Sequence, residues 1–389
     1  MRIVHVIQTL HPSAGGPPAV AMRLAAAQAA MGHSVRIVSI AESADERKAA
    51  VRASMEGIPD IERIALDGLS PADVPWPSIR SRAVFPEADV LHLHGVWEPI
   101  LLAASRWART RSIPYAVVPH GMLNPWSLSR KPWKKRLALA LGWRKMLDRA
   151  AFLHALNADE RAGLSRIGLT SPVEIIPNGI FLEEIHPVPA PGSFRPTVAG
   201  LGAAPYILFL SRLHVMKGVD RLAAAFVELA RRREDVHLVV AGPDDGERAG
   251  LERTVRDAGL ESRIHVVGPV YGTRKYAAIA DAACFCLPSR NEGFSMAITE
   301  ALALARPVVI SEACHFPEVA EAGAGVVADP EPVPLAEALL GVLSDPEAAA
   351  AMGKRGAELV RERYTWGRVA ERTLEAYARV GASTAARSR

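Results

Sequence analysis

The chain has 389 residues, which is too long for one ordinary hydrophobic core and fits two domains of about 180 residues each. Hydrophobic residues make up 49% and charged residues 23% of it, which is a globular composition. The formal net charge of +4 is a small excess that is compatible with acidic ligands or a membrane surface, but it argues against bulk nucleic-acid binding.

Cysteine usage and hydropathy narrow the class of protein further. The three cysteines form no Cys-x-x-Cys pair and no histidine cluster completes a metal set, so we predict no zinc site. A low and odd cysteine count suits a reducing compartment. The apolar run over residues 1–7 is too short for a signal peptide, and no stretch of 18 apolar residues exists. We therefore expect a cytoplasmic protein that does not span a membrane.

Short β-branched runs alternate with longer helical patterns along the whole chain. In the first half we predict strands at 2–9, 34–40, 90–95, 115–119, 151–156 and 173–177, and helices at 17–31, 98–111, 131–149 and 158–167. In the second half we predict strands at 205–211, 236–242, 263–268, 284–288, 307–311 and 325–328, and helices at 218–233, 247–258, 273–282, 295–305 and 335–343. Such alternation indicates parallel sheets covered by helices on both faces.

The two halves meet at residues 187–204, which are rich in proline and glycine and have the composition of a linker. We therefore expect an N-terminal domain over 1–186 and a C-terminal domain over 205–365. Two doubly wound domains joined in this way create a cleft at the carboxyl ends of their strands, where ligands bind in this class of fold.

Four charged residues of the second half suggest a phosphate and sugar site. Arg212 and Lys217 follow its first predicted strand, and lysine and arginine are the usual protein partners of phosphate. Glu292 and Glu300 lie eight positions apart further along the chain, and carboxylates accept hydrogen bonds from vicinal diols. Together these residues indicate a site for a nucleotide-diphosphate sugar.

The helix predicted to begin near Ser295 would separate the two carboxylates. Glu292 would precede its first turn, and Glu300 would lie roughly 8 Å further along, at about 1.5 Å per residue. The backbone amides of Gly293, Phe294 and Ser295 would be exposed at the helix N-terminus, where phosphate is favoured.

In this order and spacing the motifs resemble those of the retaining glycosyltransferases of family 4. The resemblance is carried by the Arg-x4-Lys-Gly motif, by the Glu-x7-Glu motif and by residues 288–294, 15–16 and 177–179. It runs nearly from end to end and is specific for family and fold, but it says little about substrate. It implies the GT-B fold, an α/β architecture of two doubly wound Rossmann-like domains that face each other across a cleft, with the last helix, 366–381, packed back on the first domain.

The resemblance also implies a role for each matching residue of the second domain, which would bind the nucleotide sugar. Arg212 and Lys217 would bind the donor diphosphate and stabilise the leaving nucleotide. Glu292 would contact hydroxyls of the transferred hexose, and Glu300 would hold the ribose diol. The backbone amides would come from Gly293, Phe294 and Ser295.

Further residues would complete the site. In the first, acceptor-binding domain, the resemblance places His120 near the sugar and Gly16 in the loop over the diphosphate and acceptor. Gly268 and Val270 would line the base pocket of the second domain. His94 ends a strand as His120 does, and for His94 a structural and a functional role both stay open.

The implied reaction transfers a hexosyl group from a UDP-sugar or GDP-sugar to a glycan or polyprenyl-linked acceptor, with retained anomeric configuration, in bacterial surface polysaccharide biosynthesis. The family suggests a front-face route in which the leaving phosphate takes the acceptor proton. We expect no cofactor and no metal, and we interpret Asp244-Asp245 as part of a turn.

Two other functions stay open, and a third is disfavoured by the sequence. A nucleotide-sugar epimerase of the same fold and a non-catalytic nucleotide-sugar-binding protein both stay open. A NAD enzyme is disfavoured, because the Gly15-Gly16 segment lacks the third glycine of the dinucleotide fingerprint.

Residues 130–149 combine many cations with two tryptophans and several leucines. A helix of this kind could lie in the plane of an anionic membrane, which would make the protein peripheral at the inner face of the plasma membrane. It could equally be a solvated helix whose leucines face the domain core, and both interpretations stay open.

Overall fold

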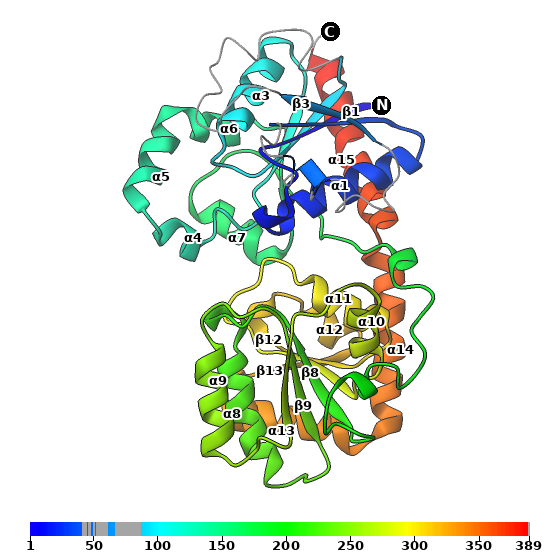
Figure 1. Ribbon diagram of the computed structural model, residues 1–389. Helices are drawn as coiled ribbons and strands as arrows, with labels where there is room; N and C mark the ends of the chain where they lie inside the picture. Colours follow the sequence, from blue (N-terminus) through cyan, green and yellow to red (C-terminus); the bar gives the residue numbers. More distant parts are fainter. Residues whose placement is uncertain (41–44, 46–47, 50, 52–60, 67–86, 388–389) are drawn as a thin grey trace. The chain divides into compact units, whose positions relative to one another are not determined.

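The computed structural model describes residues 1–40, 45, 48–49, 51, 61–66 and 87–387 (Figure 1). The chain divides into two compact units. Unit 1 consists of Met1–Asn178 together with Trp366–Arg389, and unit 2 is Gly179–Thr365. The first boundary therefore lies at Asn178, before the expected domain end at residue 186 and the expected linker at 187–204.

The segment expected to be a linker is an ordered part of unit 2. Phe194 is buried in the hydrophobic core of this unit. The backbone N–H groups of Gly192 and Phe194 donate to the carboxylate of Asp281 at 2.6 and 2.8 Å. Composition alone suggested a flexible connection here, but these contacts attach the segment to the unit that follows it.

Unit 1 is built on a seven-stranded parallel sheet with the strand order β3-β2-β1-β4-β5-β6-β7. The strands are β1 (Arg2–Ile7), β2 (Ser34–Ile40), β3 (Glu62–Leu66), β4 (Val90–His94), β5 (Tyr115–Val118), β6 (Phe152–Ala155) and β7 (Val173–Ile175). Central strands such as β4 and β5 are buried throughout, as expected of parallel strands covered on both faces. The sequence did not predict β3, because this edge strand is mostly exposed and carries no continuous apolar run.

Helices cover both faces of this sheet. On one face α1 (Gly16–Ala30) packs against α15 (Trp366–Arg387), and on the other α3 (Pro99–Thr110) packs against α6 (Arg144–Asp148) (Figure 1). The remaining helices are η1 (Pro12–Ala14), α4 (Pro125–Ser129), α5 (Pro132–Ala138), η3 (Leu139–Trp143) and α7 (Ala158–Arg166). The single helix predicted over 131–149 is thus divided into α5, η3 and α6, because Gly142 interrupts it with a φ of 125°.

Unit 2 is built on a six-stranded parallel sheet with the strand order β10-β9-β8-β11-β12-β13. The strands are β8 (Tyr206–Leu210), β9 (His237–Ala241), β10 (Ile264–Gly268), β11 (Cys284–Leu287), β12 (Val308–Ser311) and β13 (Gly325–Ala328). Their buried apolar side chains lie in the core of the unit together with those of the helices and loops that cover the sheet. The doubly wound architecture predicted for both halves is therefore confirmed.

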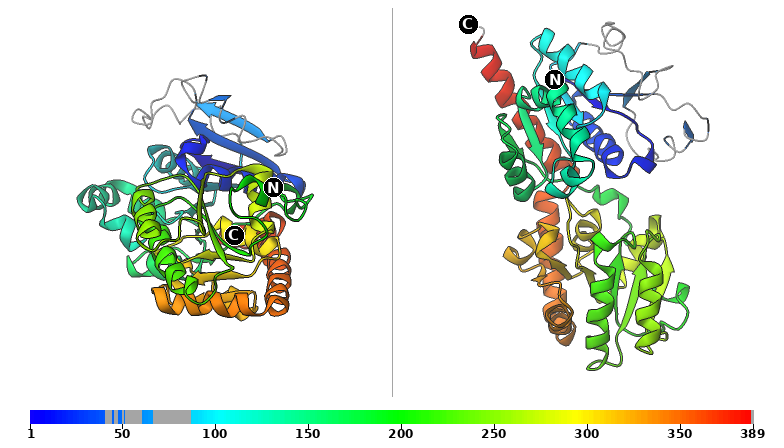
Figure 2. Two further views of the ribbon diagram at one scale, coloured as in Figure 1. Left: turned by 60° about the horizontal axis from the view of Figure 1, so that its bottom comes forward. Right: turned by 90° about the vertical axis from the view of Figure 1, so that its left-hand side faces the viewer.

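The helices of unit 2 again form two layers, which are visible in Figure 2. One layer holds α8 (Val219–Ala230), α9 (Arg248–Asp257) and α13 (Pro332–Ser344), and the other holds α10 (Gly272–Ala280), α11 (Met296–Ala303) and α14 (Pro346–Arg363). Shorter helices lie in the loops, namely η4 (Leu182–Glu184), η5 (Arg195–Thr197), η6 (Val215–Lys217), η7 (Glu312–Cys314) and α12 (Glu318–Glu321). The sequence did not predict α14, because its first turns are rich in alanine and show no clear apolar stripe.

The strand orders locate the part of each unit where a ligand would bind. Each sheet reverses its strand order at its centre, between β1 and β4 in unit 1 and between β8 and β11 in unit 2. Loops that leave the carboxyl ends of such neighbouring strands run to opposite faces and leave a crevice between them. Among the helices that the structure describes, none is both long enough and apolar enough to span a bilayer.

Candidate functional site

A buried ion pair lies where the loops after β8 and β11 meet. Lys217 Nζ is 2.6 Å from Glu292 Oε1, and the two side chains are only 18% and 6% exposed. The Ser289 hydroxyl donates to the same carboxylate oxygen at 2.9 Å. A buried carboxylate requires such partners, so the lysine and the hydroxyl together hold the Glu292 side chain in place.

Backbone contacts between the two loops hold this ion pair in place. The N–H of Arg290 donates to the carbonyl of Met216 at 2.8 Å. Gly218 adopts a φ of 72°, and a Cβ at this position would lie 2.1 Å from the carbonyl oxygen of Pro288. Only glycine allows this conformation and this approach, so the Lys-Gly sequence is what lets the loop pack closely.

Arg212 is held differently, at the surface. Its guanidinium is 60% exposed and lies 2.5 Å from Asp245, which follows β9. An exposed pair of this kind contributes at most about 1 kcal/mol, so an incoming anion can replace the carboxylate. The neighbouring Asp244 accepts hydrogen bonds from the N–H groups of Gly246 and Arg248 at 3.0 and 3.1 Å, which supports the interpretation of this segment as a turn.

Helix α11 begins one residue later than its predicted start. Ser295 is its N-cap, and the Ser295 hydroxyl accepts from the N–H of Ile298 at 3.5 Å. Gly293 is exposed just before the helix. The ring of Phe294 packs against Phe316, with 5.7 Å between centroids.

Glu300, in the second turn of α11, has a partner that the sequence did not reveal. Lys275 Nζ on α10 lies 2.7 Å from Glu300 Oε1, and both side chains are mostly buried. Burial opposes the charge of Lys275, but Glu300 and Tyr276 outweigh it and raise the lysine pKa. No sequence spacing connects positions 275 and 300, because the pair forms only when two helices pack together.

The residues expected at the base pocket lie at the end of β10, which β9 separates from β8. The carbonyl of Gly268 accepts from the N–H of Gly242 at 2.9 Å. Val270 is buried two residues later. This hydrogen bond joins the ends of β9 and β10. It does not show which nucleobase would bind there.

The two predicted residues of unit 1 follow its strands β1 and β5. Gly16 was expected in a loop, but it is the exposed first residue of α1, and Gly15 serves as the N-cap. His120 follows β5 with a φ of 52°. Its Nε2 lies 3.3 Å from His94 Nδ1, and burial lowers the pKa of His120 to about 3.

His120 belongs to a larger group that the sequence reasoning mostly missed. The group comprises four buried histidines and the partly buried His120 on the sheet face that carries α1 and α15, and we call it the histidine row: His5, His92, His94, His120 and His154. The His-x-His spacing in β4 was a usable signal, because residues two apart in a strand point to the same face. Within the described residues, no group of His, Cys, Asp and Glu side chains is arranged to hold a metal ion.

The predicted residues therefore fall into two groups, one in each unit. In unit 2, Lys217 contacts Glu292 directly, and Arg212 and Glu300 each have a different partner. In unit 1, His120 contacts His94, and a structural and a functional role for His94 both stay open.

Two family descriptions match the chain. Glycosyl transferases group 1 matches residues 199–359, which lie in unit 2. The glycosyl transferase 4-like domain matches residues 15–179, almost all of them in unit 1.

Two curated relatives illustrate the range of similarity. D-inositol 3-phosphate glycosyltransferase of Kineococcus radiotolerans is 29% identical over 259 residues, which cover 61% of this chain and 59% of that protein. GDP-mannose:cellobiosyl-diphosphopolyprenol alpha-mannosyltransferase of Xanthomonas campestris is 25% identical over 394 residues, which cover 97% of this chain and 96% of that protein.

Solved structures share the whole fold. HepE of Anabaena, crystallised in complex with UDP and glucose, superimposes with a TM-score of 0.74 at 19% identity, covering 97% of this chain and 99% of that one. At this level of identity the likeness shows the shared fold alone.

Proposed function

Because the chain belongs to the group 1 glycosyl transferases of family 4 and has their GT-B fold, we propose that this glycosyltransferase moves a hexosyl group from a UDP-sugar or GDP-sugar to a glycan or polyprenyl-linked acceptor with retained anomeric configuration. The observation that carries the proposal is the buried pair of Lys217 and Glu292 at the point where the strand order of unit 2 reverses. Ligands of doubly wound sheets bind at this point.

The leaving diphosphate would be stabilised by Arg212 and Lys217. Arg212 is exposed and can exchange Asp245 for phosphate, whereas Lys217 is already fixed by Glu292. Preorganised cations of this kind lower the free energy of a transition state in which negative charge develops on the leaving group. We propose that these two residues supply the charge without a metal ion or other cofactor.

The hydroxyls of the donor would be held by the two glutamates. Glu292 would contact the transferred hexose, next to the backbone amides of Gly293, Phe294 and Ser295. Glu300 would accept from the ribose diol, and its contact with Lys275 would hold the carboxylate in one orientation.

Unit 1 would bind the acceptor and contribute His120 and Gly16 to the site. The acceptor hydroxyl would attack on the face from which the nucleotide leaves, and the leaving phosphate would take its proton. The relative from Xanthomonas campestris uses, by its name, GDP-mannose and a polyprenyl-linked acceptor. This similarity supports a role in bacterial surface polysaccharide biosynthesis at the inner face of the plasma membrane.

Binding of nucleotides tests the donor site directly. Thermal unfolding would be followed with UDP, GDP, ADP and dTDP for the wild type and for Glu300→Ala. A nucleotide at about 100 times its Kd stabilises a protein by about 2.7 kcal/mol. We expect one nucleotide to raise the Tm of the wild type by several degrees, and we expect the variant to lose this increase.

Two controls separate binding from folding in this experiment. Glu337→Ala removes a glutamate of an exposed ion pair on α13 and should keep the stabilisation. Glu300→Ala with Lys275→Met removes both partners of the buried pair, so a poor fold of the single variant would not explain lost binding. If no nucleotide stabilises the wild type, the donor site is wrong.

Product analysis then distinguishes transfer from epimerisation. With the identified donor, free nucleotide should accumulate only when an acceptor is present, and NMR of the product should show the anomeric configuration of the donor. Conversion of the donor without any acceptor would favour the epimerase, and binding without conversion would favour a non-catalytic protein.

We further propose that residues 130–149 attach the protein to an anionic membrane surface. Trp133, Leu137 and Leu141 are 64, 52 and 60% exposed and lie four residues apart, so they form one apolar stripe. Neither α5 nor η3 buries any of its residues. Leu137 and Leu141 are therefore exposed, whereas Leu139 and Trp143 of η3 pack against the core of unit 1, as the alternative interpretation expects of its leucines.

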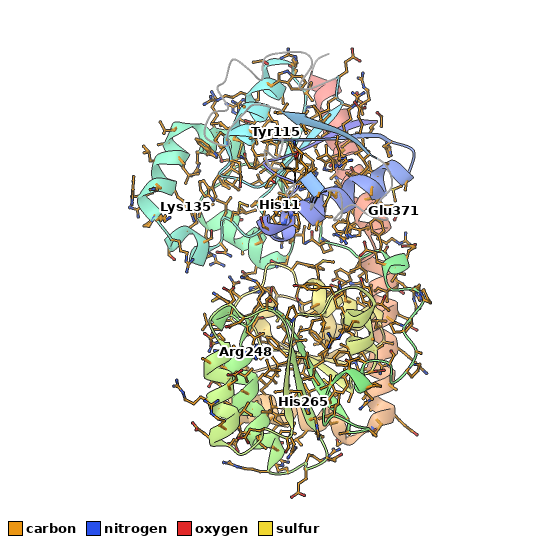
Figure 3. All side chains as sticks on the ribbon, viewed as in Figure 1. His11, Tyr115, Lys135, Arg248, His265 and Glu371 are labelled. Atoms are coloured by element: carbon orange, nitrogen blue, oxygen red, sulfur yellow. The ribbon has the colours of Figure 1, made fainter. Side chains whose placement is uncertain are left out.

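Charge on the same segment favours an anionic surface. Residues 130–149 contain eight lysines and arginines and one acidic residue, Asp148. Two of these cations have partners in unit 1: Lys135 (labelled in Figure 3) bonds the Ser127 carbonyl and lies 5.6 Å from the Trp97 ring centroid, and Arg144 lies 2.8 Å from Asp148. Lys135 therefore attaches the segment to unit 1, while Lys131, Lys134 and Arg136 are exposed and available to lipid headgroups.

Vesicle sedimentation tests this proposal. We expect the protein to sediment with phosphatidylglycerol vesicles at low salt and to remain in the supernatant with phosphatidylcholine vesicles. Glutamate at Lys131, Lys134 and Arg136 should abolish sedimentation. The matched control replaces three exposed cations of unit 2 by glutamate (Arg253, Lys354 and Arg361). Equal loss in both triple variants would mean that net charge, and not this segment, determines binding.

A further inference from the structure

A cavity of about 860 Å³ opens at the amino edge of the sheet in unit 1. Tyr115 (labelled in Figure 3) and Phe152, the first residues of β5 and β6, lie on its wall, together with residues of α3, α6 and α15. His120 follows the other end of β5, and the neighbouring strands are parallel, so the cavity lies at the opposite edge of the sheet. Its volume is within the range of about 300–1,000 Å³ that is usual for small-molecule sites.

Arg109, near the end of α3, brings an uncompensated charge to this cavity. The residue is half-buried, and its Nη1 is buried and has no hydrogen-bond partner among the described residues. Buried donors without a partner are rare in folded proteins, and they cost most where the group is charged. An anion that enters the cavity would supply the missing acceptor.

The two carboxylates at the cavity are engaged elsewhere. Asp148 accepts from Arg144 Nε at 2.8 Å and from the N–H of Thr170 at 3.0 Å. Glu174 lies 3.0 Å from Arg379 of α15. Neither carboxylate is therefore left to balance the charge of Arg109.

Arg149, which follows α6, is a second cation at the cavity. Its side chain is exposed and forms no ion pair within the part of the chain that the structure describes. The charges of Arg109 and Arg149 both act on the Tyr115 hydroxyl, where they oppose the rise in pKa that burial causes. This hydroxyl donates to the Met146 carbonyl at 2.8 Å and is neutral, so it cannot compensate the two guanidinium groups.

We propose that this cavity binds a phosphomonoester, with the phosphate group on Arg109 and Arg149 and the apolar part of the ligand against Ile113 and Phe152. A phosphomonoester carries close to two negative charges and three terminal oxygens, so it can pair with two guanidinium groups. A single carboxylate would leave one of them without a counter-charge. This site goes beyond the proposed transfer reaction and does not depend on it.

The ligand would connect elements that are far apart in the sequence. Arg109 belongs to α3, Arg149 follows α6, and Ala376 and Arg379 of α15 also line the cavity. A molecule bound among them should therefore stabilise unit 1 and hold α15 on it. The phosphomonoester can come from solution or from the headgroup of a lipid, since Arg149 is also the last residue of the segment 130–149.

Phenyl phosphate, which combines a phosphomonoester with an apolar ring, is the soluble probe. We expect calorimetric titration to show that Arg109→Met weakens its binding about tenfold or more, because charge-assisted hydrogen bonds are lost. Arg166→Met, which removes an arginine of an exposed pair on α7, should bind like the wild type. Arg212→Ala should also keep the binding. Loss in Arg212→Ala but not in Arg109→Met would place the phosphate at the proposed donor site and overturn the inference.

Stability without any ligand distinguishes a binding role of Arg109 from a structural one. Methionine keeps the apolar stem and removes the unpaired charge, so Arg109→Met should be at least as stable as the wild type in urea. An arginine that only supports the fold would lose stability on the same change. If Arg109→Met does not fold, Arg149→Met changes an exposed residue and repeats the titration, and unaltered phenyl phosphate binding in that variant would overturn the inference.

Vesicle sedimentation distinguishes the two sources of the ligand. Phosphatidic acid presents a phosphomonoester, whereas phosphatidylglycerol presents a diester. If Arg109→Met sediments less than the wild type with phosphatidic acid but equally with phosphatidylglycerol, the ligand is a lipid headgroup. Equal sedimentation of both proteins with both lipids, together with weakened phenyl phosphate binding, identifies a soluble phosphomonoester. No difference between the wild type and Arg109→Met in either experiment would overturn the inference.

Discussion

Lys217 is held in its place before any ligand arrives, and this is the main physical property of the donor site that we propose. Its partner Glu292 is buried and also accepts from Ser289, so the ammonium group cannot relax toward solvent. Arg212, by contrast, has an exposed partner that a phosphate can replace. We infer that Lys217 contributes preorganised charge and that Arg212 contributes an adaptable contact.

Replacing Lys217 by alanine should lower turnover by a factor of roughly 10² to 10³, which corresponds to about 2.7–4 kcal/mol of lost transition-state stabilisation. The change also leaves Glu292 buried without its counter-charge, so the variant should be less stable. Steady-state kinetics would measure the first effect and urea unfolding the second.

A compensating variant distinguishes catalysis from stability at this position. Lys217→Ala with Glu292→Gln removes the uncompensated charge, so stability should recover while turnover stays low. Lys354→Ala, which removes an exposed lysine of α14, is the control for both measurements. Turnover within tenfold of the wild type in Lys217→Ala would contradict the role of this lysine.

The sequence predicts individual site residues only where their spacing along the chain reflects a shared loop or helix. The contact between Lys217 and Glu292 could be predicted, because each follows a central strand and parallel strands end at the same edge. The partner of Glu300 could not be predicted, because Lys275 reaches it from a neighbouring helix. The partners of His120 were missed for the same reason, since they come from other strands and helices.

At the scale of the elements, the sheet face under α1 and α15 is unusual because of the histidines on it. It buries four histidines and partly buries His120, although histidine is only intermediate among the residues in its tendency to be buried. Each of them must be neutral in the folded protein, because burial lowers its pKa, whereas in the unfolded chain a histidine has a pKa near 6.5. The unfolded state therefore binds more protons than the folded state between about pH 4 and pH 6.5.

Stability should fall as the pH decreases through this window. Each histidine with a lowered folded pKa contributes a loss of about 1.4 kcal/mol per pH unit once the pH is below its unfolded value. We expect the free energy of unfolding, measured in urea between pH 7.5 and pH 5, to be constant at the upper end and to fall steeply below about pH 6.5. His154→Gln should give a shallower slope, and a wild-type stability that does not change down to pH 5 would contradict the assignment.

Element boundaries show which local features the sequence hides. The strands and helices with continuous apolar character were predicted close to their observed ends, because burial on a sheet leaves a clear pattern. The division of residues 131–149 was missed, because a single glycine in an otherwise helical pattern does not reveal that its φ is positive. The edge strand β3 was missed, because edge strands need no apolar run.

At the scale of the whole molecule, the chain passes between the two units twice, after Asn178 and after Thr365. The two passages are paired within unit 2, where the N–H of Ile180 donates to the Tyr364 carbonyl at 2.9 Å. They are also paired within unit 1, where Arg372 donates to the Ile175 carbonyl at 2.6 Å. The sequence instead pointed to residues 187–204 as the connection, because proline and glycine content does not reveal whether a segment packs against its neighbours.

If substrate binding closes the two units on each other, the motion should occur at the two passages and not within residues 187–204. The latter segment is fixed to unit 2 by the bonds from Gly192 and Phe194 to Asp281, so it should move with that unit as one body. Hydrogen exchange measured with and without the donor nucleotide should change at residues 178–180 and 364–366. The amides of Gly192 and Phe194 should exchange slowly in both conditions.

The variant Asp281→Ala tests whether residues 187–204 act as the hinge of this motion. It should speed exchange across 190–196, because two amides lose their acceptor, while nucleotide affinity and turnover stay within about twofold of the wild type. A connection that acts as the hinge could not be loosened without affecting closure. If Asp281→Ala lowers turnover strongly, or if donor binding changes exchange only within 187–204, then the hinge lies in that segment after all, and the paired passages merely connect the two units.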